Sequence, residues 1–402
     1  MAVKAYVFRY QSAHDYIADA PARAFDGVVA LPGLKIVEDV GVDALTNGSP
    51  LFVAVSHFSL LTDLTSQCTQ PPEKLVFLLD GEMPPEEPFL SCIKDLKEKG
   101  FTFAIENVKN FDYMEPVVQM CDYIMMSFKF NMNNLEVFRQ ISPKATARYK
   151  NHIFIATDVN SISGFHRLKE NGFHYLEGRF YNMPMPADDT ALSPVKINRI
   201  QLMNTVREPD FSIEEVVKIV SRDPSISISL LQLINSPHLG LSQKVKSVQH
   251  AVALLGQNEV RKWVTTVIAQ LLADDKPSEL TRLSLIRAKF AENLSRYFEQ
   301  AMHNNALFLM GLFSVLDVAL NMPMEDALRL ISVTEDVHAA LVHRKGKFVP
   351  IYEFILAYEQ ADWTAAKNIM AMHVIRAEDV FNAYIETVKW YDTIISPVDF
   401  DE

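Results

Sequence analysis

The pattern of apolar and polar positions changes near the middle of the chain. In the first half, short apolar runs rich in β-branched and aromatic residues recur at residues 3–10, 51–55, 74–79, 101–105, 123–126, 153–156 and 173–176. Amphipathic segments of helical period lie between several of these runs, for example at residues 87–99. Strands that alternate with helices predict parallel βα units, and so many units favour a closed TIM-like (β/α) barrel over an open sheet.

The second half lacks this strand pattern. A stretch rich in proline and acidic residues at residues 183–190 predicts a joint between two domains. From residue 195 to residue 391, apolar residues recur at helical spacing in one segment after another. We therefore expect an α/β barrel at residues 1–188 and an all-α domain at residues 194–395.

Composition and charge exclude several classes of function. The chain has 402 residues, of which 49% are apolar and 22% charged, as expected for a folded protein of two domains. Its formal net charge of −12 argues against nucleic-acid binding and against a site on an anionic membrane. Cys68, Cys92 and Cys121 form no paired spacing, which is typical of reduced thiols. No apolar run approaches the roughly 20 residues of a membrane helix, and no signal-peptide layout is present, so we expect a cytoplasmic protein.

Two polar residues, Glu106 and Asn107, follow the apolar run at residues 101–105. The C-terminal ends of parallel strands meet at the mouth of a β/α barrel, where active sites lie. Carboxylate and amide oxygens are the ligands that hard divalent cations prefer. This pair is therefore a candidate metal site, provided that other strand ends supply further ligands.

Several other chemistries are excluded by spacing. The chain has no glycine-rich phosphate loop, no Gly-x-Ser-x-Gly elbow and no His-Glu-x-x-His motif. His338 and His343 are five residues apart, so an α-helix would point them away from each other, and we expect solvated or capping histidines. The helical half also lacks an adjacent His-Asp pair. Asp317 interrupts an apolar helical segment, where a helix-edge position is favoured over partnership with a buried polar group.

The second half carries a recognisable signature in residues 223–237, which read D-P-S-I-S-I-S-L-L-Q-L-I-N-S-P, and residues 245–256, V-K-S-V-Q-H-A-V-A-L-L-G. These motifs, with looser matches at residues 285–290, 311–320 and 357–363, resemble the HDOD domain. That domain is a helical signalling relative of HD-type phosphohydrolases that has lost their metal-binding His-Asp pair. The resemblance implies a domain without catalysis. Taken alone, the apolar periodicity of these residues predicts a helical core.

The strand frames of the first half, the run at residues 96–100 and the Glu177–Gly178 pair with the residues after it resemble an EAL domain. This family is a barrel that hydrolyses cyclic di-GMP with two divalent metals. The first predicted strand of this chain corresponds to the second strand of the family, so the resemblance implies a barrel that is altered at that edge. The family's functional positions fall on Ala5, Arg9, Ala54, Leu78, Glu106, Asn107, Met125, Ser127, Thr157, Asn160 and Glu177.

Most of these positions have lost the family's chemistry. Metal-binding acids and an asparagine are replaced by Ala5, Ala54 and Leu78, and none of these side chains can ligate a metal. The lysine that positions water is replaced by Met125, and the aspartate after it by Ser127. The paired aspartates become Glu106 and Asn107, two further glutamates become Thr157 and Asn160, and a glutamine becomes Glu177. The substrate-contacting arginine survives as Arg9.

The resemblances lead to an expected function without catalysis. We expect a scaffold or adaptor that acts through protein–protein interaction near cyclic di-GMP signalling, with no cofactor and no catalytic or metal-binding residue. Its partner would be a signalling protein, and self-association stays open. The alternatives are a sensor that binds cyclic di-GMP without cleaving it, a residual phosphodiesterase, and an enzyme with a different site. Arg9 favours the sensor, whereas Glu177 would repel an anionic ligand.

Overall fold

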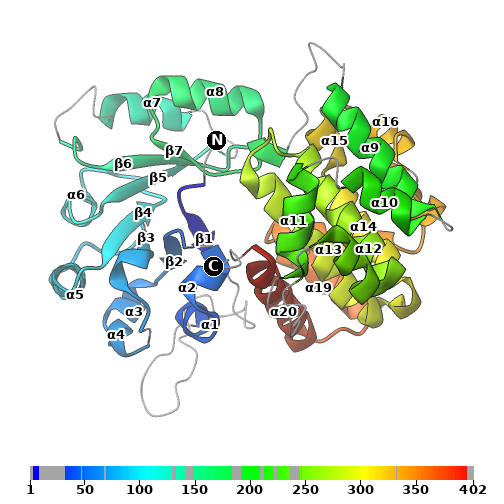
Figure 1. Ribbon diagram of the computed structural model, residues 1–402. Helices are drawn as coiled ribbons and strands as arrows, with labels where there is room; N and C mark the ends of the chain where they lie inside the picture. The colour runs from blue at the N-terminus through cyan, green and yellow to red at the C-terminus, as the bar shows by residue number, and fades with distance from the viewer. Residues whose placement is uncertain are drawn as a thin grey trace. The chain divides into compact units, whose positions relative to one another are not determined.

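The computed structural model describes residues 3–8, 32–46, 48–67, 69–128, 133–141, 148–182, 192–208, 212–220, 224–235, 245, 247–331 and 333–395. The chain separates into two compact units, Val3–Met183 and Pro184–Glu402, which we call the sheet unit and the helical unit. Figure 1 shows both. The predicted joint at residues 183–190 lies outside the described residues.

The sheet unit contains a seven-stranded sheet whose strands are all parallel and lie in sequence order. The strands are β1 (Tyr6–Phe8), β2 (Leu51–Ala54), β3 (Leu75–Asp80), β4 (Thr102–Glu106), β5 (Tyr123–Ser127), β6 (Ile153–Thr157) and β7 (Tyr175–Leu176). Its α-helices are α1 (Pro32–Val40), α2 (Val42–Thr46), α3 (His57–Leu60), α4 (Leu64–Gln67), α5 (Glu87–Glu98), α6 (Glu115–Val118), α7 (Asn133–Ile141) and α8 (Ile162–Asn171). Short 3₁₀ turns occur at η2 (Pro72–Lys74) and η3 (Phe180–Asn182).

The prediction of a closed TIM-like barrel is wrong. Among the described residues each strand pairs only with its neighbours in sequence, and β7 makes no pair with β1, so the sheet is open. A TIM barrel closes with eight strands of matched tilt and stagger. Here there are seven, and the two edge strands have only three and two residues. The apolar runs predict strands, but they carry no information about whether the two edges meet.

The open sheet is nevertheless strongly curled. The ring centroids of Phe52 on β2 and Tyr123 on β5 lie 5.1 Å apart, although β3 and β4 separate these strands. In a flat sheet, three strand spacings would hold them about 14 Å apart. The curl therefore gives the sheet an inner, concave face.

Alternation along the strands divides the sheet residues between two apolar layers. Phe77, Phe103 and Phe154 face the helices and share a core with residues of α5, α7 and α8, the last two of which run along the sheet in Figure 1. The intervening residues form the inner layer, which consists of Phe52, Val76, Leu78, Ala104, Met125 and Ile155. This period of two leaves both faces apolar, as the continuous apolar runs predicted.

The helical unit consists of α9 (Pro194–Arg207), α10 (Ile213–Val220), α11 (Pro224–Ile234), α12 (Val248–Leu272), α13 (Ser278–Leu294), α14 (Asn304–Phe313), α15 (Leu316–Leu320), α16 (Met324–Arg329), α17 (Glu335–His338), α18 (Val349–Glu359), α19 (Trp363–Met372) and α20 (Ala377–Ile395). Short turns occur at η5 (Ser295–Phe298), η6 (Ala301–His303) and η7 (Ala339–His343). None of its described residues forms a strand, so the predicted all-helical second half is confirmed. No helix in the described parts of the chain is both long and apolar enough to cross a lipid bilayer.

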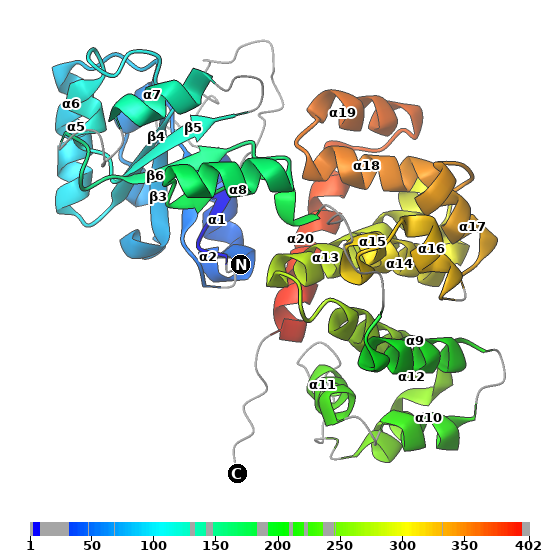
Figure 2. The ribbon, with the colours of Figure 1, turned by 90° about the horizontal axis from the view of Figure 1, so that it is seen from above.

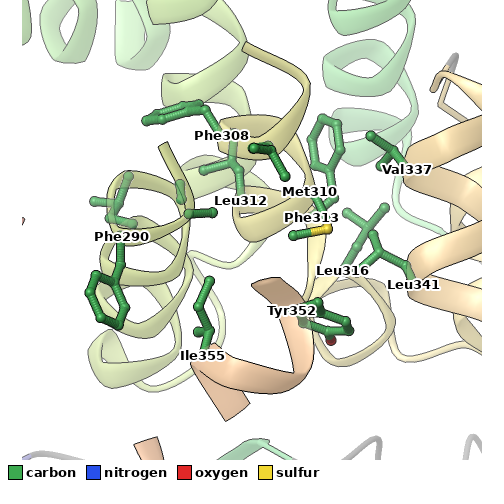
Figure 3. Close-up of a cluster of buried hydrophobic side chains, with 14 of the residues drawn as sticks. Phe290, Phe308, Met310, Leu312, Phe313, Leu316, Val337, Leu341, Tyr352 and Ile355 are labelled. Carbon is green, nitrogen blue, oxygen red and sulfur yellow. The ribbon is translucent and has the colours of Figure 1, made fainter. Parts of the chain in front are cut away.

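Helices α13 and α14 lie side by side in the middle of this unit (Figure 2). Their close approach depends on Gly311, where a Cβ atom would lie 2.5 Å from the Cα atom of Ala288. Around them, Phe290, Phe308 and Phe313 belong to one large buried cluster with side chains of α17 and α18 (Figure 3).

One turn departs from the predicted α-helical geometry. Residues Ala339–His343 form a π-helical turn, in which the N–H of Arg344 donates to the carbonyl of Ala339. Hydrogen bonds that span five residues bring side chains five apart onto one face. The rings of His338 and His343 consequently lie with their centroids 5.4 Å apart, and the prediction that they point away from each other is wrong.

Candidate functional site

The strand ends on the inner face of the sheet form the candidate site. The inner layer of β3 continues from Val76 and Leu78 to Asp80, which is paired in register with Glu106 at the end of β4. In the same way, Ser127 at the end of β5 is paired with Thr157 at the end of β6. The sheet thus places polar residues at the C-terminal ends of four neighbouring strands, β3 to β6, and we call this row of strand ends the strand-end edge.

Four of the predicted positions supply only apolar side chains. Leu78 and Met125 are each 2% exposed and belong to the inner apolar layer. Ala5 packs against that layer, and Ala54 is paired in register with Leu78. Alanine and leucine have no donor atom, and the methionine thioether is too soft for Mg²⁺. Leu78, Met125 and Ala5 therefore contribute packing, and none of the four positions supplies a ligand for Mg²⁺.

The polar side chains fall into two hydrogen-bonded groups. In the first, Asn107 donates from Nδ2 to Asp80 Oδ2 at 3.4 Å. In the second, Ser127 Oγ donates to Asp158 Oδ2 at 2.5 Å, and the backbone N–H of Asp158 donates to Glu177 Oε2 at 3.4 Å. Asp80 was not among the predicted positions. Its signal in the sequence is that it follows Leu78 by two residues, which places it on the same face of the strand.

The backbone at these strand ends keeps an unusual, closely packed form. Asn107 and Asp158, which follow β4 and β6, have φ angles of 59° and 60°. Asparagine and aspartate are among the few non-glycine residues that adopt this left-handed region readily. A Cβ atom on Gly178 would lie 2.1 Å from the carbonyl oxygen of Val159. The turns that follow β4 and β6 are therefore tight, and only a glycine fits at residue 178.

The remaining predicted positions add little to a metal site. Thr157 is buried, Asn160 is exposed, and Arg9 lies outside the described residues. Across the described parts of the chain, no group of three or more histidine, cysteine, aspartate or glutamate side chains is placed to hold a metal ion. A two-metal centre needs several ligands that converge on both ions. The residues present at this edge do not fit such a centre.

The helical unit contains a buried ion pair that the sequence did not indicate. Arg287 of α13 has only 4% of its side chain exposed. It donates from Nε to Glu359 Oε2 at 2.7 Å and from Nη2 to Oε1 at 2.9 Å, which is a bidentate arrangement. Its Nη1 donates to Ser314 Oγ at 3.1 Å. The pair ties α13 to the C-terminal end of α18.

Asp317 lies near this ion pair, in the first turn of α15. Burial raises the pKa of its carboxyl, and backbone hydrogen bonds and the charges of Arg287 and Arg344 offset this only in part. The three looser segments that resemble HDOD domains, at residues 285–290, 311–320 and 357–363, contribute Arg287, Ser314, Asp317 and Glu359 to this one region. Glu359 is bound by Arg287, and Asp317 accepts hydrogen bonds from backbone groups and is attracted by the charge of Arg287, so these interactions link α13, α15 and α18.

Comparison with known proteins identifies part of the chain. The HDOD domain model matches residues 192–354, so an HDOD domain is present there, as the motifs predicted. The first part of the signature continues into residues 223 and 236–237, which lie outside the described residues. The resemblance of the first half to an EAL domain is not tested by this match and stays a prediction.

Two relatives extend beyond the HDOD domain. The chain is 25% identical over 400 residues to the uncharacterized protein YuxH of Bacillus subtilis, covering 96% of this chain and 94% of that protein. It is 26% identical over 349 residues to the cyclic di-GMP phosphodiesterase CdgJ of Vibrio cholerae, covering 86% and 79%. A crystal structure of an HDOD domain protein from Geobacter sulfurreducens is 19% identical and covers 51% of this chain and 72% of its own, with a TM-score of 0.28. That score is too low to carry an argument.

Proposed function

We propose that this protein is a signalling adaptor that does not hydrolyse cyclic di-GMP. Its sheet unit would carry an EAL-type site that has lost its metal ligands, and its HDOD domain would act by binding a protein partner. The observation that carries the proposal is the burial of Leu78 and Met125 in an apolar layer, where the resemblance places a metal ligand and a catalytic lysine. Neither side chain can do that work.

The loss of ligands has a direct chemical consequence. Metal-dependent hydrolysis of a phosphodiester relies on bound cations to lower the pKa of the attacking water and to stabilise charge on the phosphate. Of the acids that remain, Asp80 accepts a hydrogen bond from Asn107, and Asp158 accepts one from Ser127. Asp80 and Asp158 thus belong to different hydrogen-bonded groups, which supports the absence of a metal centre that they share.

The name of the Vibrio cholerae relative favours the opposite possibility, that hydrolysis of cyclic di-GMP persists. We expect purified full-length protein to show no turnover of cyclic di-GMP with Mg²⁺ or Mn²⁺. The matched control is Glu106→Gln, which removes the acid at the predicted metal position. Metal-dependent hydrolysis by the wild type that is lost in Glu106→Gln would overturn the proposal.

Binding without cleavage distinguishes the adaptor from a sensor. Calorimetric titration of the full chain with cyclic di-GMP, with and without Mg²⁺, should show no saturable heat. Saturable binding would replace the adaptor with a non-hydrolysing sensor, and Arg9→Ala would then test whether the surviving arginine contacts the ligand. This second function rests on Arg9 alone, which lies outside the described residues.

The adaptor role also requires a partner. We expect affinity purification of the full chain from its native cells to retain one signalling protein at a fixed ratio, and that protein to bind the purified chain in isolation. A tagged chain that retains no such protein would leave the adaptor without support. Self-association is measured separately by sedimentation of the purified chain.

A further inference from the structure

The π-helical turn of the helical unit carries two neighbouring histidines. His338 ends α17 and is partly buried, whereas His343 ends the turn and is exposed. Their ring centroids lie 5.4 Å apart with an angle of 68° between the ring planes. Nothing in the proposed function uses them.

The turn gives this pair the geometry of a metal chelate. On an α-helix, residues four apart share one face, and two histidines at that spacing are the familiar zinc-binding pair. In a π-helical turn the hydrogen bonds span five residues, as the bond from the N–H of Arg344 to the carbonyl of Ala339 shows. The His-x-x-x-x-His spacing here therefore does what His-x-x-x-His does on an α-helix.

The charged groups around the turn are engaged with other partners. Lys347 forms an ion pair with Asp336 at 2.8 Å, and its Nζ lies 3.2 Å from Nε2 of His303. The guanidinium of Arg344 lies over the ring of Tyr352, 4.3 Å from its centroid. Both cations thus have partners other than the paired imidazoles. In the described parts of the chain no third side chain completes a metal site, so solvent would fill the other positions.

We propose that His338 and His343 form a two-histidine site for a borderline transition-metal cation. Imidazole nitrogen suits Zn²⁺, Ni²⁺ and Cu²⁺, whereas Mg²⁺ and Ca²⁺ prefer oxygen. Binding requires the two side chains to turn one nitrogen of each ring toward a shared ion, and the 5.4 Å between the ring centroids places the rings close enough for this. The site is independent of the strand ends in the sheet unit, so its fate and that of the proposed function are separate.

The first test is calorimetric titration of untagged full-length protein with NiCl₂, ZnCl₂ and MgCl₂. We expect one equivalent of Ni²⁺ or Zn²⁺ to bind saturably and Mg²⁺ not to bind. His338→Gln and His343→Gln should each abolish that binding, because one imidazole alone does not chelate. The double variant should therefore lose no more metal binding than either single variant. The control His166→Gln, an exposed histidine of α8, should bind as the wild type does.

Three results would overturn the proposal. They are no saturable binding of Ni²⁺ or Zn²⁺ by the wild type, unchanged metal binding by the double variant, or a single variant that still binds half as much metal as the wild type. Bound Cu²⁺ offers a second readout, because its electron paramagnetic resonance spectrum should report two nitrogen ligands in the wild type. Acidification should release the metal, since a protonated imidazole has no free electron pair.

A variant that moves one histidine tests the role of the π-helical turn itself. Val342→His combined with His343→Gln restores the four-residue spacing of an α-helical pair. If the turn is π-helical in solution, this variant should not recover metal binding. Recovery of binding, in a variant shown by circular dichroism to be folded, would contradict the assigned geometry.

Discussion

The strand-end edge of the sheet unit and the buried ion pair of the helical unit place acidic side chains in opposite surroundings. Asp80 at the edge is exposed and accepts hydrogen bonds from Asn107 and from the backbone of Glu82. Arg287 and Glu359 lie largely out of water and bind each other through two hydrogen bonds. Water can replace a partner at the edge but not in the core. Polar side chains at the exposed strand ends, such as Asp80, can therefore change at little cost to the fold, whereas a change at Arg287 or Glu359 leaves a buried charge without its partner.

The largest expected effect is the loss of the buried ion pair. Arg287→Met leaves Glu359 without its bidentate partner and Ser314 without a donor. Removing one member of a buried pair typically costs about 3–5 kcal/mol, and we expect the lower half of that range because 23% of the Glu359 side chain is exposed. Urea unfolding of the helical unit, followed by its tryptophan fluorescence, measures the change.

The matched control is a surface ion pair of the sheet unit. Lys109 pairs with Glu82, and both side chains are mostly exposed, so Lys109→Met should leave the midpoint of the urea unfolding of the sheet unit unchanged. Circular dichroism follows this transition, because all three tryptophans lie in the helical unit. Equal losses of stability in Arg287→Met and Lys109→Met would show that the buried ion pair contributes no more than the exposed one.

The next largest effect is expected at Gly311, where α14 packs against the backbone of α13 at residues 287 and 288. Gly311→Ala would put a methyl group 2.5 Å from backbone atoms of residues 287 and 288, so α13 and α14 must move apart. Overpacking of this kind costs about 1–3 kcal/mol. The decrease should appear in the same urea transition as that of Arg287→Met. A variant as stable as the wild type would show that the two helices separate freely.

A smaller effect, which depends on pH, is expected at Asp317. Because burial raises its pKa above the ordinary value of 3.8, the folded protein holds this proton more tightly than the unfolded chain does. The carboxylate therefore destabilises the fold at pH values above its folded pKa. Asp317→Asn should be more stable than the wild type at neutral pH, and the difference should vanish in acid, where both side chains are neutral. A difference of the opposite sign at neutral pH would contradict this.

The smallest effect is expected at the strand-end edge. Asp80→Asn keeps a side-chain oxygen that can accept from the backbone of Glu82, and the position is exposed. Its free energy of unfolding should stay within about 0.5 kcal/mol of the wild type. Thermal unfolding of the sheet unit measures it. A large loss of stability in Asp80→Asn would mean that acidic side chains stabilise the strand-end edge.

Much of the architecture was readable from the sequence. The apolar runs placed all seven strands of the sheet unit, and helical periodicity placed the second half as all-α. The motifs at residues 223–237 and 245–256 indicated the HDOD domain, which the family comparison places at residues 192–354. These features are local, because each depends on residues within one or two turns or one strand.

Other features depend on contacts between segments that are far apart in the sequence. Closure of a barrel depends on whether its first and last strands meet, and β1 and β7 do not pair here. Arg287 and Glu359 are 72 residues apart, so no local pattern marks them as partners. Asp80 acquires its place beside Glu106 only through the register of β3 and β4.

The sequence by itself determined that Ala5, Ala54 and Leu78 supply no metal ligand, because these side chains have no donor atom in any fold. Tertiary structure alone decided that the sheet stays open and that Arg287 finds Glu359. It also decided that His338 and His343 meet. The reason is physical: a side chain's donor atoms are fixed by its identity, whereas its neighbours are fixed by backbone geometry, and one π-helical turn is enough to change them.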